Sequence, residues 1–251
     1  RHDAKLRRGD LAGNRFVIRI REVAPSAVIA AKQVLDQLTA TGVPNFVGEQ
    51  RFGYRQNNHL LGKYLLLEQW QAFLDHMLGQ PRGDDGPSTR ARREAYMRDD
   101  FKAALEAWPK QFRHDRQALD ALRQGRSARE AVLGVDQQQL EFCLSGLQSA
   151  MFNQVLDQRL GEGSLAQLID GDLAWEHASR AVFPIDQCVA DNENAAGWRV
   201  ARMQLSPSGP MWGVDMPKPA GKPLECEVKA LHDQGLVEDD LVGHTHARTK
   251  G

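Results

Sequence analysis

Residues 42–53 interrupt the helical pattern of this chain sharply. They read GVPNFVGEQRFG, with three glycines, one proline and two aromatic side chains in twelve residues. Gly42 can end a preceding helix, and Pro44 cannot continue one, so the stretch is predicted to be an irregular loop. Two interpretations stay open. Loops of this kind often carry binding residues, and they also serve as connections between domains, with their aromatic side chains in the core.

The segment before this loop has two different periods. Residues 16–21 read FVIRIR, and this alternation predicts a strand with one apolar face and one basic face. A helix is then predicted from Pro25 to Thr41, since proline suits a first helical turn. Four apolar residues recur in it at helical spacing, and we expect them to lie in the core: Ala31, Val34, Leu35 and Leu38.

Charge is unevenly distributed along the chain. The net charge of the whole is −1, whereas residues 1–21 carry seven basic and two acidic side chains, a net charge of +5. Such asymmetry suggests a basic patch that meets an acidic partner. A solvated basic strand at the edge of a sheet explains the same pattern equally well. The arginines Arg90, Arg92 and Arg93 leave a similar choice, between contact with RNA and a solvated helix face.

The rest of the chain is predicted to be helix-rich with a few short strands. Helices are expected over residues 60–78, 91–107, 115–124, 127–132, 136–160, 186–192 and 223–234. Strands are expected over residues 173–175 and 181–183, and weakly over 200–205. The regular alternation of strands and helices that marks a doubly wound sheet is missing, so the predicted class is α+β.

The three cysteines do not suggest a disulfide framework or a zinc site. Cys143, Cys188 and Cys226 lie far apart, and no C-x-x-C pair occurs. We interpret residues 170–172 as a turn and residues 241–251 as a polar tail. We therefore expect no metal site at either place. No apolar run is long enough to span a bilayer, and a cytoplasmic location is expected. We also expect the natural chain to extend beyond both ends, because it begins without methionine and closes on a polar run.

Four stretches together resemble the TruD-type tRNA pseudouridine synthases. The first is residues 42–53, and the second is residues 5–16, KLRRGDLAGNRF. The third and fourth, residues 149–154 (SAMFNQ) and 205–213 (LSPSGPMWG), would be weak signals alone. The order and spacing of the four stretches fit the family, and the resemblance covers most of the chain.

The resemblance implies an enzyme that isomerises a uridine in tRNA to pseudouridine without a cofactor. It implies an edge of an antiparallel-sheet catalytic domain at residues 1–41, followed by a helix-rich TruD insertion domain at residues 42–240. The family's catalytic nucleophile is an aspartate in a Gly-x-Lys-Asp motif. No such motif occurs in these 251 residues, so no catalytic residue is assigned here.

The family's Gly-Asn-x-Phe motif, which borders the catalytic pocket, corresponds to Asn14 and Phe16. A turn residue and a core strand residue are the simpler interpretations of these two. The candidates for contact with RNA are Lys5, Arg7, Arg8, Arg19, Arg21 and Arg51. Supporting motif residues are Asn45, Phe46, Gln50, Phe52 and Asn153, and we expect Phe46 and Phe52 to pack where the two domains meet.

The expected partner is tRNA, with no DNA or membrane partner, and the expected protein is a monomer. Two hypotheses from other classes stay open. One is a non-catalytic RNA-binding relative or a separated RNA-binding module. The other is a helical protein-interaction domain, which would show no affinity for RNA at low salt.

Overall fold

The structure is a computed structural model that describes residues 15–241 of the 251-residue chain. It divides into two compact units, Arg1–Thr41 and Gly42–Gly251. Across residues 15–241, no helix combines the length and the apolar character that crossing a bilayer requires. The predicted turn at residues 13–14 and the predicted polar tail beyond Leu241 lie outside the described residues.

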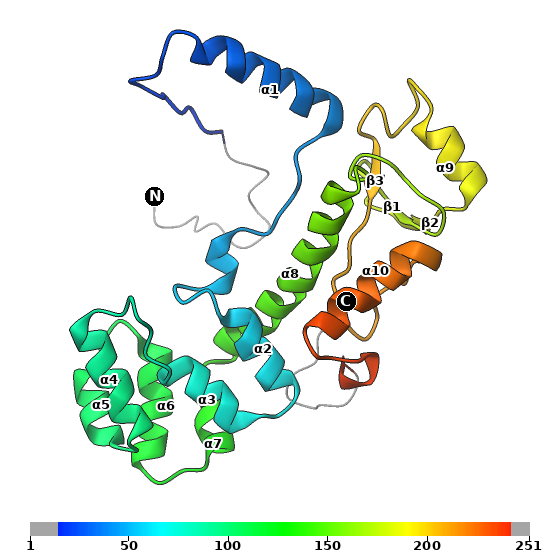
Figure 1. The fold of residues 1–251 in the computed structure, drawn as a ribbon. Coiled ribbons are helices and arrows are strands. Elements are labelled where there is room, and N and C mark those ends of the chain that lie inside the picture. The colour runs from blue at the N-terminus through cyan, green and yellow to red at the C-terminus, as the bar shows by residue number, and fades with distance from the viewer. Residues whose placement is uncertain (1–14, 242–251) are drawn as a thin grey trace, which may run out of the picture. The chain divides into compact units, whose positions relative to one another are not determined.

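The described part of the first unit contains one helix, α1 (Ala27–Thr41), which confirms the helix predicted there (Figure 1). The strand predicted over residues 16–21 is absent, and this prediction is corrected. A strand needs a neighbour for its backbone N–H and C=O groups, and residues 15–41 contain no second strand to pair with it. The expected core role of α1 is also corrected, because no residue of this helix is buried and Val34 and Leu35 are exposed.

The second unit is predominantly helical (Figure 1). Its helices are α2 (Asn58–Leu66), α3 (Trp70–Leu78), α4 (Pro87–Met97), α5 (Phe101–Ala107), α6 (Arg113–Arg123), α7 (Ala128–Leu133), α8 (Gln137–Gly161), α9 (Gln187–Asn194) and α10 (Gly221–Asp233), with short 3-10 turns η1 (Glu49–Phe52) and η2 (Glu238–Leu241). Helices α3 to α7 gather around one end of α8, and the sheet and α9 lie near its other end.

Two long helices predicted from the sequence are each divided in two. The helix predicted over residues 60–78 is broken between α2 and α3, where Glu68 has φ 53°. The helix predicted over residues 91–107 is broken between α4 and α5, where Asp99 has φ 58°. A residue in the left-handed region cannot continue a right-handed helix, so the chain turns at both positions. Asp100 then caps α5 by accepting a hydrogen bond from the Ala103 N–H at 3.0 Å.

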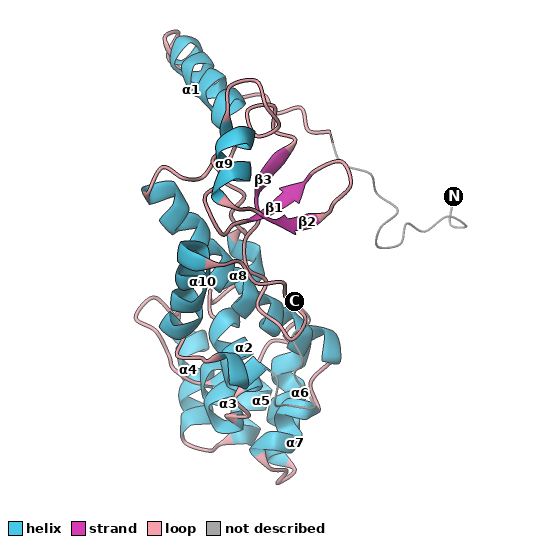
Figure 2. Ribbon diagram, turned by 90° about the vertical axis from the view of Figure 1, so that its right-hand side faces the viewer, coloured by secondary structure: helices cyan, strands magenta, loops and turns pink. Residues whose placement is uncertain are grey.

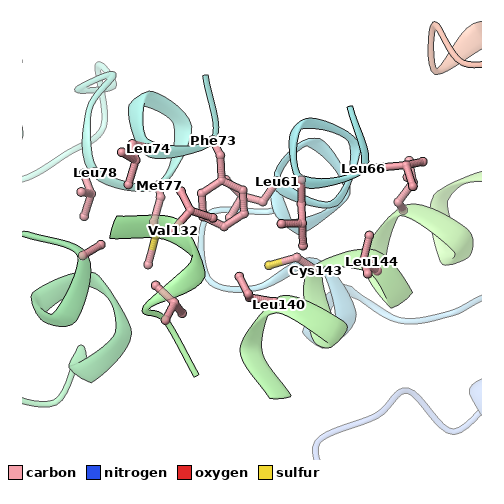
Figure 3. Packing of buried hydrophobic residues seen from close by; sticks show 14 of the residues in the cluster. Leu61, Leu66, Phe73, Leu74, Met77, Leu78, Val132, Leu140, Cys143 and Leu144 are labelled. Atoms are coloured by element: carbon pink, nitrogen blue, oxygen red, sulfur yellow. The ribbon is translucent and has the colours of Figure 1, made fainter. Parts of the chain in front are cut away.

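Helix α8 forms the long axis of the second unit, and it confirms the helix predicted over residues 136–160. Its N-cap is Asp136, whose carboxylate accepts the Gln138 N–H at 2.9 Å. Leu61 and Leu66 of α2 pack on its apolar face, whereas α3 packs against α7 (Figure 3).

Glycines allow α2 to cross α8 at close range. A Cβ at Gly62 would lie 2.3 Å from the Cys143 carbonyl oxygen, and one at Gly146 would lie 3.1 Å from Asn58 Cβ. No larger side chain fits at Gly62 without a shift of the backbone, and Gly146 leaves little room for one.

A small antiparallel sheet follows α8. Its strands are β1 (Leu173–Glu176), β2 (Val182–Pro184) and β3 (Leu205–Pro207), in the order β2-β1-β3 (Figure 2). Ala174 of β1 pairs with Phe183 on one side and Pro207 on the other. The first two strands confirm the predictions, whereas residues 200–203 form a turn. The α+β class is therefore confirmed.

A buried ionic group joins the end of α8 to the sheet and to α10. The Arg159 guanidinium donates to both carboxylate oxygens of Asp172, at 2.8 and 3.0 Å. Glu227 of α10 is only 6% exposed, and one of its carboxylate oxygens has no hydrogen-bond partner. Burial, reinforced by the nearby Asp172 charge, raises the pKa of Glu227 to about 8. The carboxyl is thus kept neutral through neutral pH.

Candidate functional site

The 42–53 loop is bound to α8 through the side chain of Asn153. Its Oδ1 accepts the Val47 N–H at 2.8 Å, and its Nδ2 donates to the Val47 carbonyl at 2.9 Å. A single amide therefore satisfies both backbone groups of one loop residue, as a neighbouring strand would. Asn153 was selected from the sequence as a supporting motif residue, and the structure brings it to the loop.

A second contact holds Arg51 against the turns of α8 that precede Asn153. Its Nη1 donates to the Ser145 hydroxyl at 2.9 Å, and its Cζ lies 5.3 Å from the centre of the Phe142 ring. We expected a phosphate or a carboxylate as the partner of this arginine. Among the described residues, Arg51 instead contacts a hydroxyl and an aromatic ring. Its other guanidinium N–H groups remain available to an anion.

Amide side chains fix the path of the loop where it enters α2. Asn58 donates to the Arg51 carbonyl at 3.0 Å, and Gln56 donates to the Gly53 carbonyl at 2.9 Å. Gly53 has φ 76°, and a Cβ there would lie 2.8 Å from the Asn58 side-chain oxygen. A glycine is therefore required at this turn for both conformation and space.

The two aromatic residues of the loop have different surroundings. Phe52 is partly buried and meets the His59 ring edge-on, with 5.8 Å between the ring centres. Burial lowers the pKa of His59, so its ring is neutral at neutral pH. Phe46 is 41% exposed, and Asn45 and Gln50 are also exposed. Packing within this unit therefore accounts for Phe52 but leaves much of Phe46 open to solvent.

The 205–213 stretch reaches α8 as well. A Cβ at Gly209 would lie 2.6 Å from a carbon of the Phe152 ring, so the turn rests directly on that ring. Gln148, one helical turn earlier, donates to the Trp212 carbonyl at 2.9 Å. Three motif stretches that are distant in sequence, 42–53, 149–154 and 205–213, thus meet along α8.

The remaining predicted residues belong to the first unit. Phe16 is 77% exposed, and Arg19 and Arg21 are exposed too. Four further candidates, Asn14, Lys5, Arg7 and Arg8, lie outside the described residues.

The structure corrects the solvated-face interpretation for two of the three arginines of α4. Arg93 has no exposed surface and Arg92 is only 7% exposed, so neither lies on a solvated face. Arg90 uses its guanidinium to bind the Arg82 carbonyl at 2.9 Å. Sequence reasoning missed this burial, although the nearby Trp108 and Phe112 supply the apolar surface against which such arginines can pack.

Comparison with known proteins identifies the family. The family model described as tRNA pseudouridine synthase D (TruD) matches residues 1–251. The chain belongs to the TruD family. A tRNA pseudouridine synthase D from Geobacter sulfurreducens is 38% identical over 238 residues, which make up 94% of this chain and 57% of that protein. A probable tRNA pseudouridine synthase D from Thermococcus gammatolerans is 31% identical over 242 residues, 93% of this chain and 57% of that protein.

A crystal structure supports the fold. The putative TruD of Methanosarcina mazei superimposes with a TM-score of 0.78 at 22% identity, over 92% of this chain and 55% of that one. The chain therefore spans a little over half the length of the TruD relatives that it matches. The resemblance found in the motif stretches is confirmed.

Proposed function

We propose that the protein to which these residues belong isomerises a specific uridine of tRNA to pseudouridine. The observation that carries the proposal is the match of the TruD family model to all 251 residues. The convergence of three family-like stretches on α8 supports it, because their contacts give these stretches one common scaffold.

The reaction detaches uracil from C1′ at N1 and reattaches it through C5, and the proton of C5 is replaced by one at N1. An aspartate nucleophile is proposed for the cleavage of the glycosidic bond, and it is not among these 251 residues. A base in folded RNA must be turned out of its stack before this chemistry. No cofactor is proposed.

Within this chain, Phe16 is proposed to stack on the flipped base beside Asn14. Its 77% exposed ring is available for such a contact. The basic side chains of the first unit are proposed to hold phosphates, together with Arg51 of the 42–53 loop. Residues 1–41 are proposed to be an edge of the catalytic domain. The exposed apolar side chains of the first unit support this proposal, because exposed apolar surface of this kind usually packs against another part of a protein.

The test is conversion of uridine in a tRNA transcript, measured by tritium release from 5-tritiated uridine. The full-length protein, acting as a monomer, should convert it, and the 251 residues alone should not. Phe16→Ala should lose roughly 5- to 150-fold in rate, since base–aromatic stacking contributes about 1–3 kcal/mol. RNA binding without turnover by the full-length protein would identify a non-catalytic relative instead. Turnover by the 251 residues alone would place the nucleophile within this chain and refute the assignment.

A further inference from the structure

Arg92 of α4 carries a buried positive charge that is not neutralised by the part of the chain that the structure describes. Its Cζ lies 5.2 Å from the centre of the Trp108 ring and 5.8 Å from that of Phe112. Its Nε is buried without a hydrogen-bond partner. The two terminal nitrogens form no hydrogen bond or ion pair with the described residues, and they are not among the buried atoms. A nearly buried guanidinium with open donors favours an anion from outside.

The neighbouring Arg55 and Arg93 also have a buried Nε without a partner, but the protein itself satisfies their terminal nitrogens. Arg93 donates to the Gly79 carbonyl at 2.7 Å, and Arg55 donates to the Asp85 carboxylate at 2.9 Å. These contacts stabilise the helical cluster. Arg92 differs from these two neighbours because its terminal N–H groups have no partner among the described residues.

A carboxylate lies in the same region but does not pair with Arg92. Asp115 accepts a hydrogen bond from the Trp108 indole N–H at 2.9 Å, and it is not within ion-pair distance of Arg92. Burial raises the pKa of Asp115 above its ordinary value, although the charges of Arg93 and Arg92 act in the opposite direction. Helix α4 itself carries three arginines and a single glutamate, so positive charge predominates on it.

An exposed aromatic ring lies beside this arginine. Tyr54 is 62% exposed, and its ring centre lies 5.3 Å from that of Phe112, the ring that also contacts Arg92. The Tyr54 hydroxyl accepts a hydrogen bond from Arg93 at 2.8 Å, which fixes the orientation of the ring. A flat ring and a positive charge thus both lie near Phe112.

We propose that Tyr54 and Arg92 form a binding site for one unpaired nucleotide of RNA, with the base stacked on Tyr54 and a phosphate held by Arg92. Base stacking on an aromatic ring and pairing of a phosphate with a guanidinium are two common contacts between single-stranded RNA and proteins. The choice of RNA over an acidic protein segment rests on the proposed function. The exposed ring supports it, because a peptide carboxylate would need Arg92 alone.

Two substitutions in the full-length protein separate the two contacts. Arg92→Gln should weaken binding of a short unpaired oligouridylate on the order of 10-fold, and it should reduce the salt slope by about 0.7. Tyr54→Leu should weaken binding by a similar factor, on the order of 10-fold, and leave the salt slope unchanged. The matched control is Arg98→Gln, which removes the same charge from an exposed position at the end of α4. Its effect should stay below about twofold.

A cross-linking measurement avoids dependence on the folding of the variants. An oligonucleotide containing 5-iodouridine forms, under ultraviolet light, a bond to an aromatic ring on which its base is stacked. Peptide mass spectrometry of the wild-type protein should find the adduct on Tyr54. Adducts found only on other residues would overturn the proposal, and so would unchanged RNA affinity in both variants. These are also the results expected if this surface binds a protein instead of RNA.

The uridine-conversion assay distinguishes this proposal from the proposed function. Normal conversion of tRNA by the wild type, combined with no adduct on Tyr54, would overturn the nucleotide site alone. Failure of the wild type to bind or convert any RNA would overturn both. An adduct on Tyr54 without conversion would support the nucleotide site and count against the catalytic assignment.

Discussion

The hydrogen-bond pair between Asn153 and Val47 gives a sharp test of how the 42–53 loop is held. Asn153→Ala removes both the acceptor of the Val47 N–H and the donor to its carbonyl. A typical intramolecular hydrogen bond contributes about 0.5–1.5 kcal/mol net, so the pair contributes about 1–3 kcal/mol. This free energy stabilises the loop in its position against α8. Only part of it should contribute to the free energy of global unfolding.

Amide hydrogen exchange measured residue by residue can detect this local change. If the Val47 amide exchanges through local opening, the loss of about 1–3 kcal/mol should speed its exchange roughly 5- to 150-fold. Amides in the interior of α8 should be much less affected, because the helix keeps its own ladder and core contacts. Asn153→Asp should also speed exchange, since a carboxylate still accepts the N–H but faces the Val47 carbonyl oxygen.

The matched control is Asp157→Ala, one turn further along α8. Asp157 is exposed, and its side chain makes no hydrogen bond or ion pair with the residues that the structure describes. It should leave exchange at Val47 unchanged. If Asn153→Ala also left it unchanged, the bidentate contact would contribute nothing to loop closure, and the reasoning would be refuted.

Two further predictions concern packing and pH. Gly62→Ala should lower the free energy of unfolding, measured with urea, by at least about 1–3 kcal/mol, because the new Cβ would lie 2.3 Å from the Cys143 carbonyl oxygen. Gly83→Ala places its Cβ in open space and should leave that free energy nearly unchanged. Glu227→Gln should gain stability over the wild type as pH rises from 4.5 to about 8, because the native carboxyl keeps its proton there while the unfolded one loses it. Exposed Glu225→Gln should lack this pH dependence, and a pH-independent Glu227→Gln would contradict the burial argument.

The elements that were predictable from the sequence carry their own signals. Helix α8 has a long apolar period and a capping aspartate at Asp136, and both operate within the segment itself. The strands β1 and β2 are short, and a turn at residues 177–179 separates them. The motif stretches predicted the family, but their sequence alone could not show that Asn153 reaches Val47, 106 residues away.

The features that escaped prediction depend on partners distant in sequence. Residues 16–21 have a strand's alternation, but pairing requires a second strand, and alternation alone does not supply one. Arg92 and Arg93 looked like surface residues because arginine is rarely buried, and their burial depends on Trp108 in another element. Glu68 and Asp99 gave no warning of helix breaks, since residues other than glycine seldom take a positive φ.

The spacing of contacts along α8 explains how one helix can position two motif loops at once. Ser145 and Asn153 hold the 42–53 loop, while Gln148 and Phe152 contact the 205–213 stretch. Side chains three, four or seven residues apart share a helix face, so these four residues lie on one broad face of α8, but the two loops are held by different side chains. Loss of Asn153 should therefore release one loop and leave the other in place. A shift of the whole helix, such as Gly62→Ala would force at the α2 crossing, should move both loops together.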